Sequence, residues 1–286
     1  MIEPVLRQCI ASDGYPLHYR QWTAADPKGI VIALHGIQSH SGWYGYSSGR
    51  LAEAGYTVCF LDRRGSGLNG RERGHAAHGE RLINDARSLA QQIRHDHEVR
   101  RFSPVPITLL GLSWGAKIAA ATAALFPDEF DQLVLLYPGL ESRIRPNPWQ
   151  RFQLNLARHF EIVRRHIPIP LSDPAMFTSR AEWQAFISAD PLALHAVTSS
   201  LLNAGRDLDI ILQRESSRIV HPLLLMLAGR DEVIDNQKVL ARIAAFGSRY
   251  VTIRTYPDAR HTLEFEAVRE TFVSHLIAWL DGLQPV

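Results

Sequence analysis

Two kinds of hydrophobic pattern alternate along most of this chain. Short, continuous apolar runs predict buried strands, whereas apolar residues spaced three or four positions apart predict helices that bury one face. The predicted strands cover residues 5–10, 17–22, 30–34, 56–62, 105–110, 132–137, 222–228 and 250–256. The predicted helices outside the middle of the chain cover residues 45–54, 79–99, 235–246 and 264–280, and another helical run begins at 116.

The alternation of strands with helices favours one fold class. An α/β protein of this kind has a mostly parallel central sheet with helices on both faces. The first two strands are an exception, because Asp13 and Gly14 between them predict a hairpin and therefore an antiparallel pair. Such sheets place their chemistry at the carboxyl ends of the strands, so functional side chains are expected in the loops that follow the strands.

The pattern changes between about 140 and 220, where no convincing buried strand interrupts a series of helical segments. These segments cover residues 149–163, 180–189 and 191–213. A length of 286 residues suits one large α/β domain that carries an inserted subdomain. We therefore expect residues 1–139 and 221–286 to form the core and residues 140–220 to form an inserted helical cap, or lid.

The composition argues against several classes of function. The 31 basic and 29 acidic residues are spread along the chain, and the net charge of +2 gives no reason to expect a nucleic acid partner. Cys9 and Cys59 both lie in predicted strands, so reduced, buried thiols are expected rather than a disulfide or a metal site. Neither a signal peptide nor an apolar run of the roughly 20 residues that span a membrane is evident. We expect a cytoplasmic protein that needs no metal and no cofactor.

The sequence Gly-Leu-Ser-Trp-Gly at 111–115 carries the strongest chemical signal in the chain. It follows a predicted strand and opens a predicted helix, which is the order of a nucleophile elbow. In such a turn the flanking glycines relieve crowding and the serine hydroxyl projects above the sheet. The N-terminus of the next helix also favours a nearby anion. The context therefore predicts Ser113 as a nucleophile.

A serine hydroxyl becomes a good nucleophile only when a base takes its proton, and an acid must hold that base in the right tautomer. In sheets of this kind the chain order is serine, then aspartate or glutamate, then histidine. Asp231 directly follows a late strand, and His261 follows the last one. Both are therefore expected at the same edge of the sheet as Ser113.

Two other aspartates compete for the role of the acid. Asp235 could merely cap the helix that begins there, and it lies one helical turn later than Asp231. Asp62 also ends a predicted strand, but it precedes the serine and so stands in the wrong order. We therefore predict Asp231 as the acid and His261 as the base.

The negative charge that develops on a substrate oxygen needs two backbone N–H donors. One is expected from Trp114, the residue after the nucleophile, and the other from the turn after an early strand. The sequence His-Gly-Ile-Gln at 35–38 is that turn, and Ile37 is the predicted second donor. His35 itself is expected to pack or to form hydrogen bonds rather than to act as a base.

Several motifs together give the chain a family resemblance. They are residues 35–44 (HGIQSHSGWY), 62–67 (DRRGSG), 73–75 (RGH), 111–115, Asp190-Pro191-Leu192, Gly229-x-Asp231 and His261. From about 15 to 280 the sequence resembles the monoglyceride lipase and lysophospholipase branch of the α/β-hydrolases, which is similar to the group called serine aminopeptidase-like. The resemblance implies the α/β-hydrolase fold and hydrolysis of esters that carry one acyl chain. It implies the same triad and the same two donors.

The predicted substrate contacts lie in the elbow and in the cap. Trp114 stands where Met or Gln is common in the resembling family, and its side chain can line an acyl pocket. In the cap, Trp149, Phe152 and Phe160 supply apolar surface that can wall an acyl channel or contact a lipid surface. An equally good alternative is that these residues only pack the cap on the core. The expected partner is a small acyl ester, and the oligomeric state is left open.

Other functions remain open at this stage. The same triad serves thioesterases, amidases or aminopeptidases, and acyltransferases, and only a panel of substrates separates them. A protein that uses this fold for binding alone is a non-enzymatic alternative, which the presence of Ser113, Asp231 and His261 disfavours. Enzymes that use an aspartate nucleophile, such as dehalogenases and epoxide hydrolases, are disfavoured because position 113 is serine.

Overall fold

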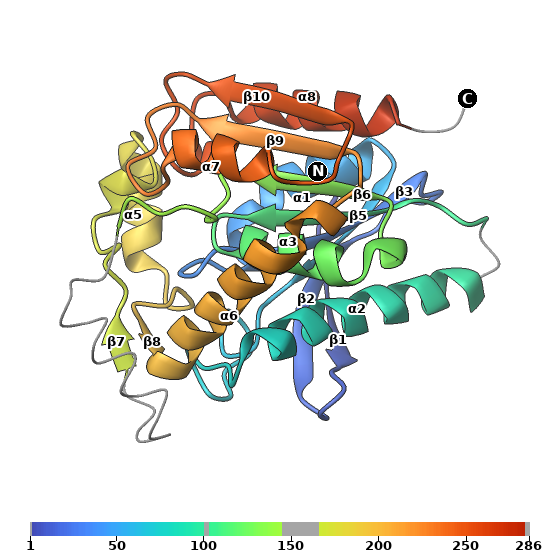
Figure 1. The fold of residues 1–286 in the computed structure, drawn as a ribbon, viewed down its shortest axis with the longest axis horizontal. Coiled ribbons are helices and arrows are strands. Elements are labelled where there is room, and N and C mark those ends of the chain that lie inside the picture. Colours follow the sequence, from blue (N-terminus) through green and yellow to red (C-terminus); the bar gives the residue numbers. More distant parts are fainter. Residues whose placement is uncertain (1, 100–102, 145–165, 284–286) are drawn as a thin grey trace.

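The computed structural model describes residues 2–99, 103–144 and 166–283. Its centre is an eight-stranded sheet with the strand order β1-β2-β4-β3-β5-β6-β9-β10 (Figure 1). β2 pairs antiparallel with β1 and with β4, and all pairs from β4 to β10 are parallel. The strands are β1 (Val5–Ile10), β2 (Pro16–Trp22), β3 (Gly29–Leu34), β4 (Tyr56–Leu61), β5 (Ile107–Leu112), β6 (Gln132–Leu136), β9 (Leu223–Ala228) and β10 (Val251–Tyr256). This confirms the mostly parallel α/β sheet and the initial hairpin.

Helices cover both faces of this sheet. Every residue of β3, β4, β5, β6 and β9 is buried, as expected for parallel strands with helices on both sides. α1 and α8 contact each other on one face, and α2, α3 and α6 contact one another on the other (Figure 1). The α-helices are α1 (Gly45–Glu53), α2 (Gly79–Val99), α3 (Gly115–Leu125), α5 (Ala181–Ala189), α6 (Ser199–Glu215), α7 (Asn236–Ile243) and α8 (Arg269–Asp281). Short 3₁₀ helices are η1 (Ser41–Tyr44), η2 (Pro127–Glu129), η3 (Pro174–Met176), η4 (Ser216–Arg218) and η5 (Leu263–Phe265).

Small side chains let α3 lie close against the sheet. Ala119 and Ala120 of α3 are fully buried. At Gly115, the first residue of α3, an added Cβ would lie only 2.3 Å from the carbonyl oxygen of Leu34 in β3. No side chain fits there without moving the helix or the strand, so the second glycine of the elbow is required by packing.

The segment between β6 and β9 differs in part from the all-helical prediction. Two short strands, β7 (His166–Pro168) and β8 (Ala196–Thr198), pair antiparallel in a separate sheet. The helix predicted over 191–213 begins only at Ser199, because the residues just before it are extended in this pairing. The Thr198 hydroxyl accepts from Leu201 N at 3.2 Å, a side-chain cap that starts α6.

Other parts of this segment agree with the prediction or lie outside the described residues. α5 matches the helix predicted over 180–189. α6 packs on α2 and α3 and therefore belongs spatially to the helical layer of the core. The helix predicted over 149–163 lies outside the described residues. None of the helices in the described ranges combines the length and apolar content that a membrane span requires.

We expect Gly115→Ala to destabilise the fold by at least about 1–3 kcal/mol, the usual cost of overpacking a filled site. Gly45→Ala is the matched control, because Gly45 is the first residue of α1 and an added Cβ meets nothing within 4 Å. Alanine should leave stability unchanged there or raise it by up to about 1 kcal/mol. Urea unfolding of both variants measures the difference. Equal unfolding midpoints would contradict the close approach of α3 to β3.

Candidate active site

Three side chains from three loops meet at one edge of the sheet. Ser113 follows β5, Asp231 follows β9 and His261 follows β10, and these strands end on the same side of the molecule (Figure 1). Nε2 of His261 lies 2.8 Å from the hydroxyl oxygen of Ser113, and Nδ1 lies 2.8 Å from Oδ2 of Asp231. The structure therefore brings together all three residues that the sequence singled out as a triad.

The backbone at Ser113 explains how its hydroxyl is presented. Ser113 has a φ of 49°, in the left-handed region that costs roughly 1–2 kcal/mol for a residue other than glycine. Its N–H donates to Leu136 O at 3.0 Å, and its carbonyl accepts from Ala116 N at 3.0 Å and Gly139 N at 2.7 Å. These hydrogen bonds hold the strained turn from both sides. The half-buried side chain then projects from the end of β5 toward His261.

Backbone N–H groups hold the carboxylate of Asp231. Its Oδ1 atom accepts from Val233 N at 2.8 Å and from Ile234 N at 2.9 Å. Its Oδ2 atom faces Nδ1 of His261. Because both oxygens are engaged, the carboxylate keeps one orientation and fixes the imidazole with it.

The two rival aspartates are engaged elsewhere. Asp235 is the N-cap of α7, where its carboxylate accepts from Lys238 N at 3.3 Å and pairs with Lys238 Nζ at 2.8 Å. Asp62 is fully buried and accepts from Ser41 N at 2.7 Å. In the part of the chain that the structure describes, neither carboxylate bonds to His261.

Aromatic rings enclose the imidazole of His261. Tyr137 and Phe177 contact it edge-on, with ring centroids 5.0 and 5.9 Å away. His261 is only 1% exposed. Apolar walls of this kind keep bulk water out and strengthen electrostatic interactions inside a site.

The two predicted N–H donors lie beside Ser113. At Gly36 an added Cβ would lie 3.5 Å from the Ser113 hydroxyl oxygen, so the Gly36–Ile37 peptide is next to the hydroxyl. Trp114 follows Ser113 directly. Within the described ranges neither the Ile37 N–H nor the Trp114 N–H donates a hydrogen bond to the protein. Two such N–H groups near a nucleophilic oxygen can bind a developing oxyanion.

His35 and Arg63 hold the 35–38 turn in place. His35 donates from Nδ1 to Gly36 O at 2.7 Å, and its Nε2 accepts from Arg63 N at 2.9 Å. Burial, together with the neighbouring Arg63 guanidinium, lowers the pKa of His35 to about 3, so the ring stays neutral. Both ring nitrogens are engaged, and His35 therefore positions backbone. Arg63 has no role predicted from sequence, although it lies in the 62–67 motif.

Comparison with known proteins agrees with this geometry. The family model described as serine aminopeptidase, S33, matches residues 25–267. The chain belongs to this family. It is a serine hydrolase with the α/β-hydrolase fold, which confirms the resemblance seen in the sequence motifs.

Individual relatives of this S33 family member are lipases. The monoacylglycerol lipase of Mycolicibacterium smegmatis is 25% identical over 273 residues, which cover 93% of this chain and 93% of the relative. The monoglyceride lipase of Rattus norvegicus is also 25% identical, covering 96% of this chain and 91% of the relative. A solved soluble variant of the monoglyceride lipase from Saccharomyces cerevisiae, in complex with a substrate analog, has a TM-score of 0.85 at 21% identity and covers 100% of this chain and 97% of its own. The structural likeness shows the shared fold.

In this family member the inserted segment is tied to the turn beside Ser113. Asp190 accepts from Nε2 of His40 at 2.9 Å and from the indole nitrogen of Trp43. Burial alone would raise the pKa of Asp190, but these hydrogen bonds outweigh it and lower the pKa to about 2. Leu194 N also donates to Gln38 O at 2.9 Å. The motif that begins at Asp190 therefore connects the insertion to residues 35–44.

The inserted segment also holds the loop that carries His261. Thr262 N donates to Phe177 O at 2.8 Å. The Glu266 carboxylate accepts from Ser179 N at 2.7 Å and from the Ser179 hydroxyl at 3.0 Å. Two loops of the candidate site thus depend on the same insertion for their position.

Of the predicted substrate contacts, only Trp114 lies within the described residues. Its half-buried ring has the Arg63 guanidinium 4.9 Å from its centroid. It also packs on α6, where a Cβ added at Gly205 would lie 3.2 Å from the indole. The other three predicted contacts, Trp149, Phe152 and Phe160, lie outside the described residues.

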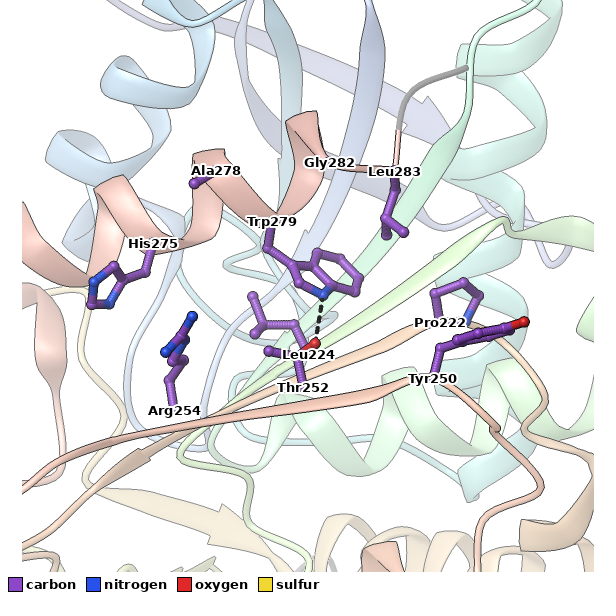
Figure 2. A pocket seen from close by; sticks show the side chains of 10 residues that line it. All are labelled: Pro222, Leu224, Tyr250, Thr252, Arg254, His275, Ala278, Trp279, Gly282 and Leu283. Carbon is purple, nitrogen blue, oxygen red and sulfur yellow. Dashed lines mark hydrogen bonds between the residues drawn. The ribbon is translucent and has the colours of Figure 1, made fainter. Parts of the chain in front are cut away.

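A cavity of about 590 Å³ lies away from the triad, between α8 and strands β9 and β10 (Figure 2). Its lining includes Tyr250, Arg254 and Trp279, and the Trp279 indole N–H donates to the Thr252 hydroxyl at 3.2 Å. No triad residue and no predicted oxyanion donor lines it. Across the described ranges no group of three or more His, Cys, Asp or Glu side chains is arranged to hold a metal ion.

Glu264, in the short helix η5 after His261, is a buried carboxyl group that sequence patterns did not single out. One oxygen, Oε1, accepts from Ser47 N in the first turn of α1 at 3.0 Å. The other, Oε2, has no hydrogen-bond partner among the described residues. Burial raises the pKa of Glu264 to about 7.

This raised pKa makes stability depend on pH. The folded-state pKa of about 7 lies above the ordinary value of 4.5, so the folded state binds more protons between these two pH values. Glu264 therefore destabilises the fold increasingly as the pH rises through that window. Glu264→Gln removes this effect, and its Tm should exceed that of the wild type by more at pH 8 than at pH 5. Each kcal/mol regained corresponds to about 2–4 °C in Tm.

Glu266→Gln is the matched control, because Glu266 is also buried but both its oxygens accept from Ser179. A glutamine at 266 keeps only one of the two acceptor oxygens that bind Ser179, so its Tm at pH 8 should fall below that of the wild type. Glu264→Gln should instead raise the Tm at pH 8. Thermal unfolding at both pH values measures the two variants. A Glu264→Gln advantage that is equal at pH 5 and pH 8 would exclude the raised pKa.

Proposed function

We propose that this protein hydrolyses carboxylic esters that carry a single acyl chain, with monoacylglycerols as the first substrate class. The observation that carries the proposal is the hydrogen-bond chain from Asp231 through His261 to Ser113, with 2.8 Å at both steps. An oriented histidine next to a serine hydroxyl is what that hydroxyl needs to attack an acyl carbon.

The proposed reaction has an acyl-enzyme intermediate. Nε2 of His261 takes the proton from Ser113 as its oxygen attacks the ester carbonyl carbon. Asp231 keeps the other imidazole proton on Nδ1 and stabilises the cation that forms. The imidazolium then protonates the departing alcohol, and the acyl group stays on Ser113. His261 next removes a proton from water, and the water oxygen attacks the acyl carbon. The imidazolium then returns that proton to the Ser113 oxygen as the acyl–serine bond breaks, and the carboxylic acid leaves.

The N–H groups of Ile37 and Trp114 are proposed to bind the oxyanion of both tetrahedral intermediates. Their position beside Ser113 and their lack of other acceptors among the described residues support this role. α3 starts at Gly115, so its positive N-terminal dipole adds to the same stabilisation.

The substrate class rests on relatives and on the surroundings of the triad. Relatives from Mycolicibacterium smegmatis and Rattus norvegicus are named monoacylglycerol lipase and monoglyceride lipase. Beside His261, the rings of Phe177, Trp43, Phe265 and Phe186 contact one another in series, and Phe186 reaches the surface. Of these four rings only Phe186, which is 38% exposed, offers apolar surface that suits an acyl chain. Lysophospholipids also carry one acyl chain and form a second class within the same proposal.

We propose that the part of residues 140–220 that precedes α6 acts as the cap over this site, and that residues 1–139 and 221–286 form the core on which α6 packs. The hydrogen bonds of Asp190 and Ser179 to loops of the site support this division. α5 also lies at the edge of the sheet where β5, β9 and β10 end (Figure 1).

Ser113→Ala should lower the hydrolysis of monoacylglycerols by about 10⁶-fold, as in other triads that lose the nucleophile. Mass spectrometry of a substrate panel measures it, with monoacylglycerols, lysophospholipids, acyl thioesters and aminoacyl amides at matched concentrations. A fluorophosphonate probe should label the wild type at Ser113 and leave the variant unlabelled. Turnover retained by Ser113→Ala would reject the triad, and faster cleavage of thioesters or amides than of esters would reject the substrate class.

Asp231→Asn should lower kcat by about 10⁴-fold, because an amide no longer holds the imidazole in its working tautomer. Asp235→Asn is the matched control, since Asp235 caps α7 and asparagine caps a helix equally well. Its kcat should stay within about twofold of the wild type. Steady-state kinetics on one ester compare the pair, and similar losses in both variants would remove Asp231 from the triad.

A further inference from the structure

We propose that Arg63 is a positioning residue for the oxyanion hole, which it organises by binding the Ile37 turn and the Trp114 ring at the same time. The inference rests on the proposed function, because it assumes that the Ile37 and Trp114 N–H groups bind an oxyanion. Arg63 stands behind these donors and does not itself contact the triad in the described hydrogen bonds.

The first link runs through one peptide unit. Nη1 of Arg63 donates to Gly36 O at 3.3 Å, and His35 Nδ1 donates to the same oxygen at 2.7 Å. The carbonyl of Gly36 and the N–H of Ile37 belong to a single planar trans peptide, so they point in opposite directions. Fixing the carbonyl on Arg63 therefore fixes the direction of the Ile37 N–H.

A second hydrogen bond removes the remaining freedom of the turn. Nη2 of Arg63 donates to Ile37 O at 3.0 Å. One rigid guanidinium thus spans two successive carbonyls, which a flexible ammonium group cannot do with the same geometry. The Arg63 cation also polarises the Gly36–Ile37 peptide through the Gly36 carbonyl. This polarisation makes the Ile37 N–H a stronger hydrogen-bond donor.

The other link is to the residue after the nucleophile. The Arg63 guanidinium lies 4.9 Å from the centroid of the Trp114 ring. The ring also packs against Gly205 of α6. Arg63 and α6 together hold Trp114 in place, and with it the backbone that supplies the second N–H donor.

Arg63 carries a positive charge in a buried position, which is unusual for arginine. This supports a functional role for the charge. Arg63 is 5% exposed, its Nε has no hydrogen-bond partner among the described residues, and no ion pair to a carboxylate is found for it there. The next residue, Arg64, is 7% exposed and pairs with Asp85 at 2.5 Å. A buried cation that pairs directly with no carboxylate is costly, and the nearby Asp62 carboxylate offsets only part of that cost, because burial still lowers the pKa of Arg63 to about 9. The buried cation becomes favourable when a negative oxygen forms nearby, as in the transition state.

The test compares Arg63→Met and Arg63→Lys with Arg64→Met and Arg64→Lys. Arg64 is the matched control because it is equally buried and also lies over a ring, with Tyr15 at 4.7 Å, but it binds Asp85 and Asp13. The readouts are kcat and KM for one monoacylglycerol, Ki for an acyl trifluoromethyl ketone, and Tm. The Ser113 oxygen adds to the ketone carbon and produces an oxyanion. The Ki of the ketone therefore measures transition-state binding.

We expect Arg63→Met to lower kcat about 10²-fold and to weaken ketone binding by about the same factor, the usual effect of losing one oxyanion donor. KM should change less than about threefold. Arg63→Lys keeps the charge, but its ammonium group cannot span both carbonyls, so kcat and ketone binding should each fall by more than about threefold and by less than in Arg63→Met. The Arg64 variants should lower Tm and leave kcat and Ki within about threefold of the wild type.

The inference fails if folded Arg63→Met keeps kcat and ketone Ki within about threefold of the wild type, or if the Arg64 variants lose as much. Where Arg63→Met does not fold, Arg63→Lys is decisive under the same criterion. These results differ from a failure of the proposed function, which would appear as a wild type without ester hydrolysis or as an active Ser113→Ala.

Discussion

The left-handed backbone at Ser113 is the constraint on which the rest of this structure depends. A residue other than glycine persists in that conformation only when its surroundings enforce it. Here α3 is pressed against β3 at Gly115, and the Ser113 carbonyl accepts from Gly139 N at 2.7 Å. The sheet and the helix therefore fix one point in space for the hydroxyl. The loops that carry the base, the acid and the N–H donors need only converge on that point.

Those loops are held by buried polar side chains, because the only helices next to the site residues in them are short 3₁₀ helices such as η1 and η5 in the described ranges. Asp190 binds His40, and Glu266 binds Ser179. Arg63 does the same for the turn that carries Ile37. Each of these contacts satisfies polar groups that burial would otherwise make costly. The same contacts connect the inserted segment to the core, so the position of the insertion and the geometry of the site are linked.

Much of the fold and of the candidate site follows from local patterns. Strands buried on both faces must be apolar throughout, which is why the runs at 30–34 and 222–228 were recognisable. The glycines of 111–115 are required by a turn that leaves no room for a side chain. The short strands β7 and β8 were missed because β7 is largely exposed and strands of three residues carry almost no hydrophobic period. Buried charges such as Arg63 were missed because arginine is mostly found at the surface.

The sequence by itself determined the order of strands and helices, the elbow at Ser113 and the loops in which a base and an acid had to lie. Each of these depends on residues that are close together in the chain. The sequence also favoured Asp231 over Asp235, and the tertiary structure places the Asp231 carboxylate against His261. Only the tertiary structure decided that Arg63 binds the carbonyls beside Ile37 and that Asp190 binds His40. Such contacts join segments that are distant in sequence, and the folded packing of the sheet, the helices and the insertion sets the distances between them.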